Sequence, residues 1–213
     1  MKKNIEKFQK DGYCIVKSAV SDELRDFVTQ YTLFDEMQDF TPDGSQVPTA
    51  HSKYGDPTME AMLLHLHTKM EENTGLSLFP TYSFYRVYRK GDELTVHKDR
   101  PSCEISCTLC FNHSYDREDY KWPIFMDGNQ ADLEPGDMVI YRGCDLDHWR
   151  DPFDITDNEA WHVQGFFHYV DAKGPYTDHK FDQRNSIGDI DKNKIRENNL
   201  NNKIDLPSYI SYS

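Results

Sequence analysis

Residues 81–99 read TYSFYRVYRKGDELTVHKD, two runs rich in aromatic and β-branched residues on either side of a Gly-containing turn. Such runs, bounded by turn residues, are typical of β-strands. The second run ends at His97, and Asp99 lies two residues further on. Because side chains two apart along a strand point to the same face, the triplet His97-Lys98-Asp99 predicts an imidazole and a carboxylate directed to one side.

The same pattern of short aromatic and β-branched runs between turns continues to residue 170. Turn signals separate five further short segments: CEISCTLCF (103–111), KWPIFM (121–126), DMVIYR (137–142), DHWR (147–150) and AWHVQGFFHYV (160–170). No segment with helical periodicity lies between them. Seven short strands in this arrangement predict an antiparallel sandwich or barrel, with its core over about residues 81–170.

The region before this barrel predicts helices that flank it. GYCIVKSAV (12–20) indicates a short strand that leads into a helix over 21–31. A second helix over 57–73 carries an apolar stripe that we expect to pack against a sheet. Residues 35–55 are polar and contain several Pro and Gly, so they predict a long loop and a candidate lid over a site.

Length and composition favour one globular domain. The chain has 213 residues, 37% hydrophobic and 29% charged, which predicts a single domain over 1–175 and a polar tail or arm over 176–213. The formal charge of −13 argues against binding of nucleic acid, and no apolar run approaches the roughly 18 residues of a membrane span. With no signal peptide after the first residues and five cysteines, a cytoplasmic protein with reduced thiols is expected.

A third candidate metal ligand, His148, follows the strand 137–142 and a short turn. Two imidazoles and one carboxylate on two strands form a facial triad, which leaves three coordination positions open. Such a triad suits non-haem Fe(II) that must also bind a co-substrate and dioxygen. We therefore expect His97, Asp99 and His148 to be the metal ligands and the catalytic residues.

The ordered set of motifs resembles a known family over about residues 12–170. It is similar to the Fe(II)- and 2-oxoglutarate-dependent oxygenases, in particular their prolyl-hydroxylase-like branch. The matching elements, in chain order, are Tyr88, Gly91, the His97–Asp99 triplet, CEISCTLCFN, the turn EPGD and His148. The resemblance implies a double-stranded β-helix, a jelly-roll or cupin-like core with N-terminal flanking helices.

The resemblance also implies the chemistry. Members of the family bind Fe(II) and 2-oxoglutarate, with ascorbate as a further cofactor, and use dioxygen to hydroxylate a substrate with formation of succinate and CO2. For this chain it implies a dioxygenase acting on an unknown organic or peptidyl substrate, with a peptidyl or amino-acid side chain favoured. The acidic body suits a neutral or basic partner.

One departure from the family concerns the co-substrate. The family places Arg or Lys near the start of the last barrel strand, where it binds the distal carboxylate of 2-oxoglutarate. Here His162 and Gln164 occupy the corresponding positions. The nearest strong base is Arg150, on the same strand face as His148, and Arg86 is the next choice, before Arg142 and Arg100. Arg150 can instead pair at the surface with Asp151 or Asp154. The resemblance adds Tyr88 as a 2-oxoglutarate ligand.

The other histidines and cysteines give weaker signals. His65 and His67 diverge on the predicted helix, and His51 is expected to be solvated in the loop. Either His162 or His168 can enter the pocket or pack in the core. Cys103 and Cys107 face away from Cys110 on a strand, so these three do not predict a metal cluster.

Two other classes of function remain open on the sequence. One is a catalytically inactive, cupin-like binding protein, in which at least one metal ligand should be missing. The other is a metal-dependent hydrolase or isomerase on a related barrel, which often uses three or four histidines. The complete triad, with its Asp, favours the oxygenase over both.

Overall fold

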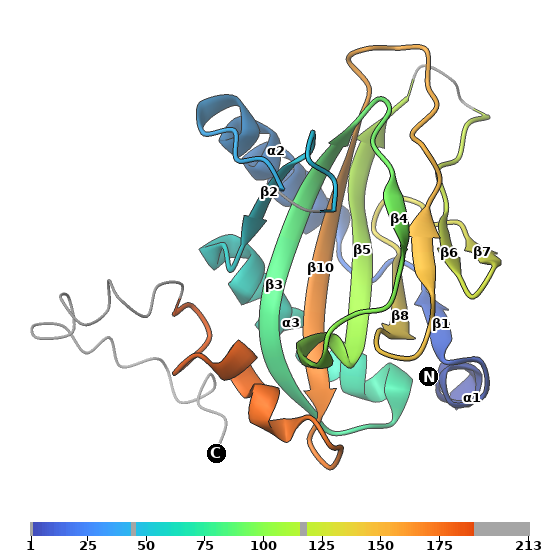
Figure 1. Cartoon of the computed structure of the whole chain (residues 1–213), viewed down its shortest axis with the longest axis vertical. Coiled ribbons are helices and arrows are strands. Elements are labelled where there is room, and N and C mark those ends of the chain that lie inside the picture. The colour runs from blue at the N-terminus through green and yellow to red at the C-terminus, as the bar shows by residue number, and fades with distance from the viewer. Residues whose placement is uncertain (1, 44–45, 116–118, 190–213) are drawn as a thin grey trace, which may run out of the picture.

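The computed structural model describes residues 2–43, 46–115 and 119–189, and two antiparallel sheets form its centre (Figure 1). The larger sheet has the strand order β1 (Tyr13–Val16), β8 (Met138–Arg142), β5 (Ile105–Ser114), β10 (Trp161–Asp171), β3 (Leu78–Arg89) and β2 (His51–Tyr54). The smaller sheet has the order β4 (Leu94–His97), β9 (His148–Arg150), β6 (Ile124–Met126) and β7 (Asn129–Ala131).

From β3 onward the chain passes repeatedly between the two sheets. β3, β5, β8 and β10 lie in the larger sheet, and the strands between them lie in the smaller one. This alternation defines the jelly-roll topology of a double-stranded β-helix. The predicted fold class is confirmed, because all seven expected strands form, and within the described residues only the short 3-10 helix η1 (Pro101–Cys103) lies between them.

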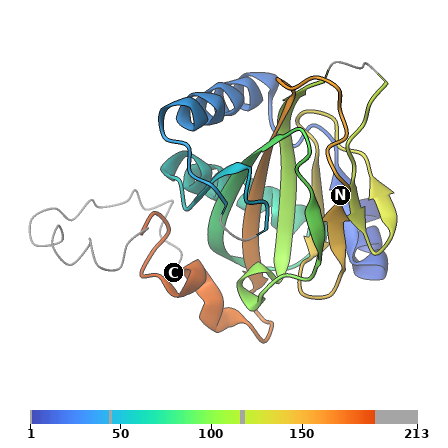
Figure 2. The ribbon, with the colours of Figure 1, turned by 45° about the horizontal axis from the view of Figure 1, so that its top comes forward.

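Helices flank the barrel as expected. α2 (Asp22–Gln38) and α3 (Pro57–Thr74) lie behind the larger sheet, and α1 (Lys2–Asp11) packs against α3 (Figures 1 and 2). Asp56 caps α3 by accepting hydrogen bonds from the backbone of Thr58 and Met59. The apolar stripe of α3 is 0–4 % exposed and consists of Met59, Met62, Leu63, Leu66 and Met70.

Some elements differ from the sequence expectation. α1 was not predicted, α2 extends seven residues beyond 31, and β2 and β7 form inside stretches expected to be loops and turns. β2 is polar, but its backbone pairs with the edge of β3, so a tertiary partner decides its conformation. The expectation of a solvated His51 was wrong: His51 is fully buried, and its ring nitrogens bond to Thr41, Asp35 and Tyr85.

Residues 177–189 pack against the barrel beside α3. They begin with the 3-10 segment η2 (Thr177–Gln183), and Arg184 then forms a buried ion pair of 3.1 Å with Glu60. The rest of the expected tail, 190–213, lies outside the described residues, so a separate arm over 176–213 stays a prediction. No helix in the described part of the chain is long and apolar enough to cross a membrane.

Candidate metal centre and co-substrate site

The structure brings His97, Asp99 and His148 together. His97 ends β4 and faces His148, the first residue of β9, across the strand pair, and their ring centroids are 4.2 Å apart. Oδ1 of Asp99 lies 3.6 Å from Nε2 of His97 and 3.5 Å from Nε2 of His148. One potential ligand atom from each residue therefore lies within 4.8 Å of the other two.

Backbone contacts orient the two imidazoles. Nδ1 of His97 lies 2.8 Å from the carbonyl of Thr95, and Nδ1 of His148 lies 3.0 Å from the carbonyl of Leu146. A carbonyl only accepts, so each Nδ1 carries the proton and each Nε2 keeps its lone pair. Protein metal sites commonly fix their histidine ligands in this way.

The protonation states also suit a divalent cation. Burial, together with the neighbouring His148, lowers the pKa of His97 and favours the neutral imidazole. Burial alone would raise the pKa of Asp99, but the neighbouring histidines, first of all His148, outweigh it, and the net pKa is below its usual value. Two imidazoles and one carboxylate are the donor set of the facial triad of non-haem Fe(II) proteins, so these residues fit that ion.

Gly143, on the turn after β8, supports Asp99. Its carbonyl accepts a hydrogen bond of 2.8 Å from the backbone N–H of Asp99. A Cβ on Gly143 would collide with the Asp99 carboxylate and with the carbonyl of Cys103. Sequence reasoning missed this residue; its only signal was a glycine in the turn that precedes His148.

Ser106, Cys103 and His168 lie close to Asp99. Ser106 Oγ lies 3.4 Å from Oδ2 of Asp99 and 2.8 Å from Nδ1 of His168. Asp99, Cys103 and His168 also form a geometrically possible metal group. Burial raises the pKa of the Cys103 thiol and keeps it protonated, and protonated thiols are poor ligands. The triad with two histidines is therefore the better metal site.

A cavity of about 430 Å³ adjoins the triad. Its walls are aromatic on several sides, and Asp43 and Gln46 from the expected lid contribute to it. His168 enters this cavity, whereas His162 does not. Three cationic side chains also line it: Arg86, Lys98 and Arg100. The volume falls within the range typical of small-molecule sites.

Arg150 is buried in the barrel, 2 % exposed, and does not line this cavity. Its guanidinium donates to the carbonyl of Trp122 at 2.5 Å and to Oε1 of Gln164 at 2.9 Å, and it lies 4.5 Å from the Trp122 ring centroid. Its Nε has no hydrogen-bond partner, and no carboxylate in the described part of the chain pairs with it. The alternative pairing with Asp151 or Asp154 is therefore wrong.

A network around Gln164 fixes Arg150 in place. Oε1 of Gln164 accepts from Arg150 and from Nε2 of His162 at 2.6 Å, while its amide donates to Thr108. Nδ1 of His162 accepts from the hydroxyl of Tyr115 at 2.7 Å. Burial lowers the pKa of His162 far below its usual value, which keeps the ring neutral. Thus the positions where the family places a strong base hold neutral groups that orient an arginine from the facing sheet.

Arg86 differs from Arg150 because it already has an anionic partner. Its guanidinium lies 2.5 Å from Asp43, and it donates to Gln46 and to the hydroxyl of Tyr88 at 2.8 Å. Burial lowers the pKa of Arg86, but Tyr88 and Asp43 raise it, and the net direction is upward. For Arg150 burial dominates and the pKa is lowered.

The other two arginines considered have partners elsewhere. Arg100 lines the cavity but forms two bonds with Asp182, of 2.6 and 2.9 Å. Arg142 lies over the ring of Phe8 and does not line the cavity. Neither offers a free guanidinium to a co-substrate.

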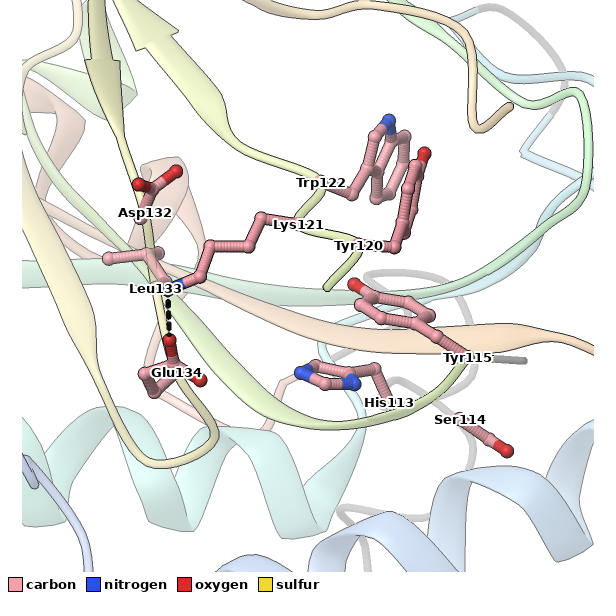
Figure 3. Close-up of a pocket in the computed structure, with 9 residues that line it drawn as sticks. All are labelled: His113, Ser114, Tyr115, Tyr120, Lys121, Trp122, Asp132, Leu133 and Glu134. Atoms are coloured by element: carbon pink, nitrogen blue, oxygen red, sulfur yellow. Dashed lines mark hydrogen bonds and ion pairs between the residues drawn. The ribbon is translucent and has the colours of Figure 1, made fainter. Parts of the chain in front are cut away.

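A second cavity, of about 600 Å³, opens where β5, the segment before β6 and the segment after β7 meet (Figure 3). His113 and Tyr115 stack in parallel with ring centroids 3.9 Å apart, and Lys121 reaches across to Glu134 with an ion pair of 2.7 Å. The cavity contains none of the predicted metal ligands. It borders Trp122, whose ring also contacts Arg150.

Comparison with known proteins gives a clear answer at the level of fold. No protein-family model matches the chain, and no curated protein matches its sequence. Among solved structures, a Pseudomonas putida prolyl-4-hydroxylase is similar over 78% of this chain and 97% of that chain, at 16% identity and a TM-score of 0.58.

Two further solved structures lead to the same fold. HygX from Streptomyces hygroscopicus, with nickel and 2-oxoglutarate bound, matches 81% of this chain and 88% of that chain, at 10% identity and a TM-score of 0.62. A Trichoplax adhaerens prolyl hydroxylase matches 81% of this chain and 92% of that chain, at 12% identity and a TM-score of 0.59. The expected resemblance is confirmed: this chain has the double-stranded β-helix fold of 2-oxoglutarate- and Fe(II)-dependent oxygenases, including those of the prolyl-hydroxylase-like branch.

Proposed function

We propose that this protein is a non-haem Fe(II)- and 2-oxoglutarate-dependent dioxygenase that hydroxylates its substrate and forms succinate and CO2. The observation that carries the proposal is the convergence of the two Nε2 atoms of His97 and His148 on the carboxylate of Asp99. This donor set stands beside a cavity of suitable size on a fold that hosts this chemistry.

In this proposal the triad holds Fe(II) on one side only. The bound metal would supply the positions at which 2-oxoglutarate chelates and dioxygen is activated. The backbone contacts of His97 and His148 keep both Nε2 atoms directed at the metal position, and Gly143 holds Asp99 against them. The protein thus fixes the ligands before the metal binds, which reduces the cost of ordering them.

Arg150 is the proposed partner of the distal carboxylate of 2-oxoglutarate, with Tyr88 as a further ligand. A fully buried guanidinium with only neutral acceptors is electrostatically incomplete, and a carboxylate is its natural partner. Arg86 is the alternative, but a co-substrate bound there would have to displace Asp43. Side-chain movement near Trp122 would be needed to open Arg150 to the cavity.

Hydroxylation of a peptidyl or amino-acid side chain is the substrate class that we favour. The similar structures do not share one reaction: one is titled a prolyl-4-hydroxylase, another an epimerase and a third a carbocyclase. The fold therefore supports the oxygenase class, and the finer reaction rests on the prolyl-hydroxylase-like motifs of the sequence.

The test is aerobic incubation of the full chain with Fe(II) and 2-oxoglutarate, with succinate measured by mass spectrometry. Basal turnover without substrate should form succinate and consume dioxygen, and Asp99→Ala should abolish both without unfolding the chain. Asp145→Ala changes an exposed acid near the same turn and serves as the matched control. An inactive binding protein would form no succinate, and a hydrolase would need neither dioxygen nor 2-oxoglutarate. Untargeted mass spectrometry for products heavier by one oxygen atom would then identify the substrate.

A further inference from the structure

We propose that the primary substrate is a small molecule with a flat apolar body and an anionic group, and that Lys98 binds this group at the cavity together with Arg86 and Arg100. The inference rests on the proposed function, with Arg150 as the partner of 2-oxoglutarate. It narrows the favoured substrate class to a free acid, such as an amino acid, and away from a basic partner or a peptide.

The charged residues around the cavity favour an anionic ligand. Three cations and two carboxylates, Asp43 and the proposed metal ligand Asp99, line the cavity in a chain that has 24 basic and 37 acidic residues. Asp43 is paired with Arg86, and Asp182 with Arg100, which leaves Lys98 exposed and without an ion-pair partner among the described residues. An unpaired cation at the cavity of an acidic protein attracts small anions, while the acidic surface repels an acidic protein partner.

The environment of Arg86 suits a carboxylate. This residue is 2 % exposed, and its Nε has no hydrogen-bond partner. Its guanidinium lies over the rings of Phe84 and Phe166, at 5.1 and 5.2 Å from their centroids. Asp43 is the carboxylate that it binds now, so the site is already shaped for an acidic group. A substrate carboxylate that reaches Arg86 would have to displace Asp43, as 2-oxoglutarate would.

The aromatic walls of the cavity suit a flat apolar molecule. Tyr54 and Tyr82 stack with centroids 4.9 Å apart, and Arg100 lies 4.6 Å from the centroid of Tyr82. Phe84 and Phe166 form a second aromatic pair. Flat rings beside cations suit an apolar body that ends in an anion. The cavity of about 430 Å³ must also receive the co-substrate, so the part of the substrate that enters it is small.

The experiment uses the full chain loaded with Mn(II) and saturating 2-oxoglutarate, with dioxygen excluded. Four matched probes are titrated, and the paramagnetic broadening of their proton signals is measured: phenylacetate, phenylacetamide, phenyl phosphate and phenethylamine. We expect phenylacetate to bind at least about tenfold more tightly than phenylacetamide, because it adds a charge-assisted hydrogen bond. If phenyl phosphate binds more tightly than phenylacetate, the substrate is a phosphorylated molecule. If phenylacetate binds more tightly, the substrate is a carboxylic acid. Either result supports an anion site.

Two variants test the residues. Lys98→Gln should reduce the preference for the anion about fivefold, and Lys98→Arg should keep it, with the affinity for 2-oxoglutarate unchanged in both. Asp43→Asn should strengthen anion binding, since it releases Arg86; a purely structural role of Asp43 would not produce this gain.

Three results would overturn the proposal: equal or absent binding of all four probes, a preference for phenethylamine, or displacement of phenylacetate by 2-oxoglutarate. Failure of the chain to bind Mn(II) or 2-oxoglutarate would instead refute the proposed function, so the two failures can be told apart.

Discussion

Replacement of Arg150 by Met tests the co-substrate site through stability, without any substrate. If 2-oxoglutarate binds the folded protein only, a concentration of about 100 times its dissociation constant stabilises the fold by about 2.7 kcal/mol. For a chain of this size each 1 kcal/mol raises the melting temperature by about 2–4 °C, so the metal-loaded protein should gain about 5–10 °C. Loss of the charge-assisted hydrogen bonds of the guanidinium should weaken binding about 100-fold. The gain in Arg150→Met, at the same concentration, should then fall to about 1–2 °C.

The assay is thermal unfolding followed by circular dichroism, with Mn(II) present and dioxygen absent, with and without 2-oxoglutarate. Arg86→Met is the matched control, because Arg86 is equally buried but already paired with Asp43. Arg86→Met should keep most of the rise in melting temperature that 2-oxoglutarate causes. Arg150→Lys keeps the charge and loses the planar fork, so the Michaelis constant for 2-oxoglutarate should rise several-fold. The assignment of Arg150 as the 2-oxoglutarate ligand would be refuted if 2-oxoglutarate raised the melting temperature of Arg150→Met fully but did not raise that of Arg86→Met. Arg86 would then be the ligand.

Three further predictions follow from the structure. Gly143→Ala should displace the Asp99 carboxylate and weaken Mn(II) binding measured by calorimetry, with the fold retained; unchanged affinity would remove Gly143 from the metal site. Arg184→Met should leave the buried Glu60 unpaired and destabilise the fold by about 3 kcal/mol in urea unfolding, whereas a change near zero would show that the pair contributes little. Burial lowers the pKa of His168 from 6.5 to about 4, so the unfolded chain takes up the proton first as the pH falls. The free energy of unfolding should therefore drop by about 3 kcal/mol from pH 6.5 to 4. Equal slopes of this free energy against pH in the wild type and in His168→Gln would contradict the prediction.

The strands of the barrel were predictable because their signal is local. Aromatic and β-branched runs between turns specify β3, β4, β5, β6, β8, β9 and β10 without knowledge of their partners. β2 was missed because its sequence, HSKY, is polar, and only pairing with β3 makes it a strand. α1 was missed although its sequence is amphipathic. Phe8 is its one fully buried residue, so the apolar face that marks the helix is narrow.

The site was predictable where its residues are ordered along the chain. His97, Asp99 and His148 follow from strand periodicity and from the order of motifs, and the structure brings them together. Gly143, Ser106 and the partners of Gln164 were not found, because each acts through a contact across the barrel that no local pattern encodes. The sequence shows the neutral residues His162 and Gln164 where the resembling family has a strong base. It does not show that these two residues orient Arg150.

The position of Arg150 links the metal to the co-substrate through one strand. His148 and Arg150 both lie on β9, two residues apart and on one face, so their separation along the strand is about 6–7 Å. In the proposed complex the metal end and the distal carboxylate of 2-oxoglutarate would be held by the two ends of this three-residue strand. A family pattern that places the base on the last strand depends on the register between two strands, whereas here β9 alone sets the spacing. The last strand, β10, is then left to orient the guanidinium through Gln164, and a diacid one carbon longer should fit poorly because β9 cannot lengthen to receive it.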